Sequence, residues 1–133
     1  MIGYVNRNVN PKNRKTGDCA IRAVATAAGI PYEVAQKMLF EAAADTCYDY
    51  ADKKCVDKVL TKLGFVKHKQ PKYINIYDQT KKYLVGEIDH LISLRARAVV
   101  LMANHYTAVV DHDCIDTWDC REKTIGNYWT KEE

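Results

Sequence analysis

Three residues of types that can together attack a carbonyl group lie far apart in this chain: Cys19, His105 and Asp116. A cysteine thiolate is a nucleophile, an imidazole can take and return the proton, and a carboxylate can orient the imidazole. Such groups are usually distant in the sequence and close in space. The candidate chemistry is therefore cysteine-dependent attack on an amide, if the fold brings the three side chains together.

Cys19 stands where a helix is expected to begin. Asp18 is a good N-cap, an alanine-rich run over 19–28 follows, and Gly29 ends it. A thiol in the first turn of a helix ionises more readily because the unpaired backbone N–H groups and the helix dipole favour the thiolate. The alternative is that Cys19 is only a small buried residue of this helix. We predict from its place at the helix start that Cys19 is the nucleophile.

His105 is the best candidate base among the four histidines. It begins a strand-like run over 105–110, and Asn104 before it marks a strand end at which a polar side chain can face a cleft. The other histidines occur in a lysine-rich loop, a charged helix and a tight turn: His68, His90 and His112. The alternative for His105 is a structural role in its strand.

Asp116 lies near His105 only in one pairing register of the expected strands. If residues 111 and 112 form a hairpin turn, the numbers of paired residues sum to about 223. Trp118 then lies opposite His105, with Asp116 diagonal to it on the same face. A turn centred one residue later would place Cys120 opposite His105 and carry Asp116 too far away. The other interpretation of Asp116 is a solvent-facing strand residue.

The elements that must position these residues are predicted from apolar periodicity. In chain order we expect an arm over 1–16, helices over 18–28, 31–45, 51–63 and 85–92, and strands over 65–66, 98–102, 105–110 and 114–118. The last three strands should form an antiparallel meander. Early helices and late strands indicate one α+β domain over 1–133, with its N-terminal helices packed on a small antiparallel sheet.

Length and composition favour a globular protein. The chain has 133 residues, 47% of them hydrophobic and 28% charged, as in soluble domains. No apolar run approaches the roughly 20 residues that cross a bilayer, and residues 1–15 are polar and basic, so we expect neither a signal peptide nor a membrane anchor. Five cysteines without dense spacing fit a reduced, cytoplasmic protein.

Two blocks of the sequence resemble the papain-like cysteine peptidase superfamily. The segment Thr-Gly-Asp-Cys-Ala-Ile-Arg-Ala at 16–23 looks like its nucleophile helix, most closely in small bacterial and phage proteins near the bacteriocin-processing C39 peptidases. Residues 104–118 are similar to the histidine strand and the strand that follows it. In that superfamily an Asn-Ser-Trp sequence supplies the partner of the imidazole and a Trp that shields the pair from water. Asp-Thr-Trp at 116–118 looks like the counterpart.

The resemblance implies a papain-like fold and a thiol hydrolase, whether peptidase, isopeptidase or amidase. It implies a protein or peptide substrate and catalysis by a Cys-His-Asp triad without a cofactor. The superfamily also has a Gln six positions before the cysteine, whose amide helps to bind the oxyanion. Asn13 stands at that spacing here and is the fourth candidate catalytic residue.

The main alternative is a non-catalytic papain-like protein that binds and occupies a host or regulatory protein. Residues 58–82 carry seven lysines against one acid, Asp78, and we expect them to form a surface that chooses a protein partner. Tyr73 and Tyr77 among these lysines would suit a single-stranded nucleic acid. The net charge of +3 is too small to favour that interpretation.

A zinc site is a further alternative, because four metal-binding residue types occur in one short region: His105, His112, Cys114 and Cys120. Structural zinc sites usually contain close ligand pairs such as Cys-x-x-Cys, and this region has none. We therefore predict no metal at the site.

Overall fold

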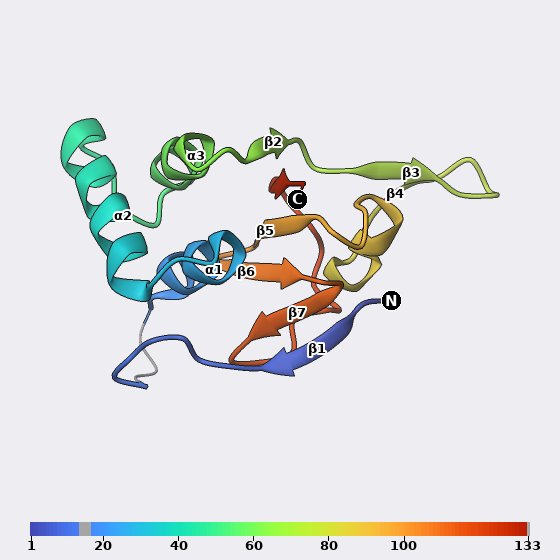
Figure 1. The fold of residues 1–133 in the computed structure, drawn as a ribbon. Coiled ribbons are helices and arrows are strands. Elements are labelled where there is room, and N and C mark those ends of the chain that lie inside the picture. The colour runs from blue at the N-terminus through green and yellow to red at the C-terminus, as the bar shows by residue number, and fades with distance from the viewer. Residues whose placement is uncertain (14–16, 133) are drawn as a thin grey trace.

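A computed structural model describes residues 1–13 and 17–132 of the chain (Figure 1). Its helices are α1 (Cys19–Ala28), α2 (Tyr32–Thr46), α3 (Lys53–Lys62) and the 3-10 helix η1 (Val85–His90). Its strands are β1 (Gly3–Asn6), β2 (Val66–His68), β3 (Lys72–Ile74), β4 (Thr80–Lys82), β5 (Arg97–Met102), β6 (His105–Val110), β7 (Asp113–Asp116) and β8 (Tyr128–Lys131). Within the described residues, no helix combines the length and apolar character needed to cross a membrane.

Six strands form one mixed sheet in the order β1-β7-β6-β5-β8-β2. The strands β5, β6 and β7 pair as antiparallel neighbours, which confirms the predicted meander. β1 lies parallel to β7 at one edge, and β8 is inserted between β5 and β2 on the other side. β1, β8 and β2 thus complete a sheet whose centre comes from residues 97–116.

The helices α1 and α3 pack against one face of this sheet, and α2 packs on these two helices (Figure 1). Alternation along β5 sends Val99 into the core beneath the helices and Val100 into a second core on the opposite face. Ile88 of η1 belongs to that second core. The α+β class and the packing of the N-terminal helices on a sheet are confirmed, but the sheet is mixed and larger than the small antiparallel one expected.

Three segments differ from the sequence-based expectation. Residues 3–6 form β1 although 1–16 were expected to be an arm, and the lysine-rich stretch contains the β3–β4 hairpin. The strand β8 was not expected at all. These are short strands whose pairing partner lies far along the chain or is itself mostly polar, so local apolar alternation does not reveal them.

The helix α1 begins at Cys19 and ends at Ala28, followed by Gly29 with φ of 67°. Both boundaries agree with the prediction, and glycine suits the left-handed conformation that ends the helix. Asp18 occupies the N-cap position, but its side chain makes no capping hydrogen bond. It contacts other side chains instead, and these contacts connect the helix to the candidate site.

Candidate active site

The β6–β7 hairpin has the register that places Asp116 near His105. Its cross-strand pairs, Ala108 with Ile115 among them, have residue numbers that sum to 223. Asp111 and His112 form the turn with φ of 52° and 58°. Positive φ at both central residues is the signature of a type I′ turn, whose twist matches that of two antiparallel strands. This turn therefore fixes the pairing register of β6 and β7, and with it which residues of the two strands lie opposite each other.

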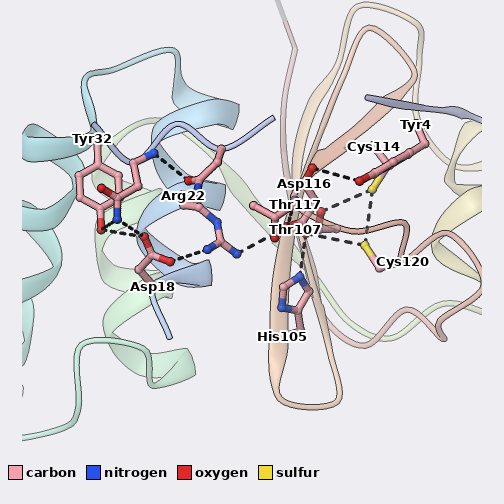
Figure 2. A network of polar contacts seen from close by, with 12 residues as sticks. Tyr4, Asp18, Arg22, Tyr32, His105, Thr107, Cys114, Asp116, Thr117 and Cys120 are labelled. Carbon is pink, nitrogen blue, oxygen red and sulfur yellow. Dashed lines mark hydrogen bonds and ion pairs between the residues drawn. The ribbon is translucent and has the colours of Figure 1, made fainter. Parts of the chain in front are cut away.

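His105 lies at the start of β6 and contacts two residues near the end of β7. Its Nε2 donates a hydrogen bond to Oδ2 of Asp116 over 2.7 Å (Figure 2). The indole of Trp118 lies with its centroid 4.9 Å from that of the imidazole, at an interplanar angle of 50°. Trp118 thus covers one side of the ring, although it is itself 40% exposed. The predicted neighbours of His105 are both in place.

Cys19 approaches the same imidazole from the first turn of α1. Its thiol lies near the His105 side chain and the Tyr106 backbone, both of which lower its pKa, and it lines the same cleft as His105. Since Nε2 of His105 is taken by Asp116, the ring nitrogen left for Cys19 is Nδ1. The structure therefore brings together three of the four predicted site residues: His105 is hydrogen-bonded to Asp116, and Cys19 lies beside His105 in the same cleft.

The electrostatic environment favours the thiolate form of Cys19 and the imidazolium form of His105. Burial raises the pKa of Cys19, but the neighbouring His105 side chain and Tyr106 backbone outweigh burial and bring this pKa below its ordinary value. Burial lowers the pKa of His105, yet the hydrogen bond to Asp116 and the neighbouring Cys19 thiol raise that pKa to about 9. Burial also raises the pKa of Asp116, and its hydrogen bonds, led by that with His105, lower the pKa overall. Each member thus stabilises the charged form of the next.

Asp116 is held in place by more than His105. Its Oδ1 accepts from the backbone N–H of Thr117 over 2.7 Å and lies 3.6 Å from Nη2 of Arg22. Only 3% of the Asp116 side chain is exposed. A carboxylate this deeply buried needs such partners, because burial otherwise penalises its charge. The contacts fix the oxygen that faces the imidazole.

Arg22 was not predicted as a site residue. Figure 2 shows its guanidinium between the carboxylates of Asp18 and Asp116, and it forms an ion pair with each. Arg22 lies one helical turn after Asp18 on α1, and the i,i+4 spacing of an acid and a base is a signal visible in the sequence. What the spacing does not reveal is the second carboxylate, which comes from β7.

Asp18 connects this ion pair to the N-terminal segment. Its Oδ2 accepts hydrogen bonds from Nδ2 of Asn10 and from the hydroxyl of Tyr32, each over 2.9 Å. Asn10 is the buried amide of this segment, whereas Asn13 is exposed and has φ of 50°. The amide of Asn10 therefore supports Asp18, and the proposed contact of Asn13 with an oxyanion stays a prediction.

A cleft of about 520 Å³ opens beside the thiol and the imidazole. Cys19 and His105 line it together with Gly17, Lys53 and Leu101, among others. Gly17 has no other atom within 4 Å of the position that a Cβ would occupy, so a substrate can approach the backbone next to the cysteine. The thiol is thus accessible in a partly apolar cleft, as nucleophilic attack requires.

Two further thiols lie behind Asp116, on the side away from Arg22. The sulfur of Cys120 is 3.8 Å from Oδ2 of Asp116 and 3.5 Å from the sulfur of Cys114, and both cysteines are buried (Figure 2). His105, Asp116 and Cys120 offer ligand atoms within 4.8 Å of one another and could hold a metal ion. His112, also considered as a zinc ligand, lies in the turn at the other end of the hairpin. A metal here would compete with the hydrogen bond between His105 and Asp116.

The comparisons with known proteins leave this site without a named relative. No family model, no curated protein and no solved structure matches the chain. The resemblance to papain-like peptidases therefore stays a prediction, based on the residues of the two sequence blocks.

Proposed function

We propose that this protein is a cysteine-dependent hydrolase that cleaves an amide bond through Cys19, His105 and Asp116. The observation that supports the proposal is the position of His105, which is hydrogen-bonded to Asp116 and shares the wall of one cleft with Cys19. An imidazole in this position can exchange a proton with the thiol while the carboxylate fixes its orientation and tautomer. The cleft beside the thiol gives a carbonyl group access to it.

The proposed reaction has two steps. The Cys19 thiolate attacks the carbonyl carbon, the C–N bond breaks, and the proton on His105 passes to the departing amine. A water molecule then gives a proton to His105 and attacks the resulting thioester, which releases the acid and restores the thiol. The backbone N–H of Cys19 lies in the first turn of α1, where backbone donors have no intrahelical partner, and would stabilise the oxyanion. The side-chain amide of Asn13 would be the second donor.

We also propose that the enzyme is papain-like, close to the small C39-like bacterial and phage proteins. The argument is the combination of a nucleophile at the start of the first helix, a histidine at the start of a central strand and an acid-x-Trp sequence that begins at the last residue of the next strand. The contact of Trp118 with the His105 ring supports the role of this tryptophan as a shield. In this proposal the substrate is a protein or peptide.

Iodoacetamide labelling, read by mass spectrometry in the presence of a chelator, tests the nucleophile. Near pH 6.5 Cys19 should react about tenfold faster than Cys47, the exposed cysteine on the C-terminal end of α2. His105→Gln should remove most of this difference, because glutamine can donate to Asp116 but cannot carry the positive charge. Equal rates at Cys19 and Cys47 in the unmodified protein would contradict the proposal.

A second candidate function is that of a non-catalytic binding protein, and one feature favours it. The β3–β4 hairpin extends away from the rest of the molecule in Figure 1 and exposes Ile74, Ile76 and Tyr77. Exposed apolar residues among lysines suit a protein contact. Fast labelling of Cys19 without release of product from any peptide or amide library, together with capture of a defined partner by the hairpin, would favour this function over the hydrolase.

A further inference from the structure

Two more hollows continue the cleft that contains Cys19. The second, of about 410 Å³, shares Leu101 and Met102 with the first. The third, of about 250 Å³, shares Met102, Ala103 and Thr124 with the second. Neighbouring hollows share wall residues near the β5–β6 turn, and we call the three together the groove.

The charged side chains of this groove have one sign. Each hollow has one lysine in its wall, Lys53 in the first, Lys82 in the second and Lys123 in the third. Among the described residues that line the three hollows there is no Asp or Glu. The whole chain carries 20 Lys and Arg against 17 Asp and Glu, so this lining departs from the average composition.

The three lysines come from separate parts of the sequence. Lys53 begins α3, Lys82 ends β4, and Lys123 lies between β7 and β8. Only Lys82 belongs to the lysine-rich segment 58–82. The fold, and not a single basic run, therefore places one lysine beside Cys19 and two more along the neighbouring hollows.

From this lining we infer that the groove binds an acidic peptide segment and presents its amide bond to Cys19. Glu or Asp side chains of the peptide would pair with the lysines, and its apolar side chains would pack on Leu101 and Met102. Lys53 shares the first hollow with the thiol, so one acidic residue should lie close to the reacting bond. The cleavage part of this inference rests on the proposed function, and the binding part does not.

A peptide suits the groove better than a nucleic acid does. Binding of a single strand uses many cations and a series of aromatic rings on which bases stack. The groove offers three lysines, and its aromatic members are Tyr106 in the first hollow and Trp118 in the third. Its middle part is lined by aliphatic and small polar residues, Leu101 and Thr124 among them.

The binding test uses Cys19→Ala, which cannot turn over a substrate. The probe is a fluorescein-labelled twelve-residue peptide with three Glu and three Leu in a Gly-Ser background, compared with its Gln analogue by fluorescence anisotropy. The Glu peptide should bind about tenfold more tightly at low salt, and the difference should shrink as salt rises. In the same Cys19→Ala background, the combination Lys53→Glu, Lys82→Glu and Lys123→Glu should abolish the preference.

A matched control changes the net charge equally at exposed positions outside the groove: Lys37→Glu, Lys67→Glu and Arg95→Glu. The control should keep the preference for the Glu peptide, and circular dichroism should show both triple variants folded. Equal binding of the Glu and Gln peptides, or equal loss in the control, would overturn the inference. So would an oligonucleotide of the same charge that binds as tightly as the Glu peptide.

The binding result and the proposed function can fail separately. If Cys19→Ala prefers the Glu peptide but Cys19 in the unmodified protein shows no His105-dependent labelling, the groove is an acidic-peptide site without hydrolase chemistry. If labelling depends on His105 but the peptide preference is absent, the hydrolase remains and its substrate class is a different one.

Discussion

The two hairpins of this protein differ in what surrounds them. The β6–β7 hairpin lies in the middle of the sheet, with buried residues on both strands and with His105 hydrogen-bonded to Asp116. In β3 and β4 every residue is exposed, and Ile76 in the connecting segment is 89% exposed. Burial specifies the register of a strand pair, because a slip by one residue would move its apolar side chains to the wrong face.

The difference shows which hairpin can support chemistry. A triad needs its groups held within tenths of an ångström, which the buried β6–β7 pair with its fixed register can provide. The exposed hairpin has no such constraint, but its lysines and apolar tip are free to meet a partner. We therefore expect substitutions in the first hairpin to change reactivity and those in the second to change association only.

The largest effect should follow from Cys19→Ala. Because the other cysteines are buried or lie on the far end of α2, none can replace Cys19 in the cleft. Intact-mass measurement after mixing with an activated ester should show an acyl-enzyme in the unmodified protein and none in the variant. An adduct of equal yield in Cys19→Ala would mean that another residue is the nucleophile.

Asp116 should have the next largest effect. Asp116→Ala leaves His105 without its partner and removes one of two carboxylates from Arg22, so turnover should fall about a hundredfold and the protein should also be less stable. Asp116→Asn should be milder, since its amide oxygen can still accept from the imidazole. Turnover of a reporter amide separates the two, and thermal unfolding reports the stability. A loss of stability with normal turnover would show that Asp116 is structural only.

The pH dependence of stability should reveal the ion pair. The pKa of His105, raised to about 9, contributes stability that is complete below about 6.5, its unfolded value, and is lost as the pH rises through 9. The lowered pKa of Cys19 works in the opposite direction, since its contribution grows as the pH rises toward the unfolded value of the thiol. The free energy of unfolding should thus fall less steeply between pH 6.5 and 9 in the unmodified protein than in Cys19→Ala. Urea titrations at several pH values measure it, and identical slopes would argue against a charged pair.

The smallest effect should come from the tip of the exposed hairpin. Ile76→Ser and Tyr77→Ser remove side chains that are 89% and 75% exposed, so the free energy of unfolding should change by less than about 0.5 kcal/mol. The labelling rate of Cys19 should not change. Binding to a protein partner should weaken, and Lys72→Glu with Lys81→Glu should weaken it in a salt-dependent way. A slower reaction at Cys19 would show that the hairpin belongs to the active site.

The parts of the fold that could be predicted are those specified locally. The start of α1 at Cys19 follows from an N-cap position and a helix-forming run, and the register of β6–β7 follows from a two-residue turn between alternating strands. The contact of His105 with Asp116 follows from that register. These features depend on residues close in the sequence, so their local patterns contain the necessary information.

The parts that could not be predicted depend on distant partners. The strand β1 exists because β7 lies beside it, more than a hundred residues later. The role of Arg22 depends on Asp116 coming to the same place from another element, and the groove depends on three lysines from separate elements. No property of residues 1–6 or of Arg22 alone indicates these contacts.

The long sequence distance between Cys19 and its neighbours His105 and Asp116 has a consequence for the order of events during synthesis. The lowered pKa of Cys19 needs His105, which Asp116 holds in place, so the thiol stays an ordinary one until residues up to 116 have left the ribosome. Contacts this distant in sequence form slowly compared with helices. The rate at which Cys19 becomes reactive after dilution from urea therefore reports the rate of the late folding step in which α1 packs against the β6–β7 hairpin.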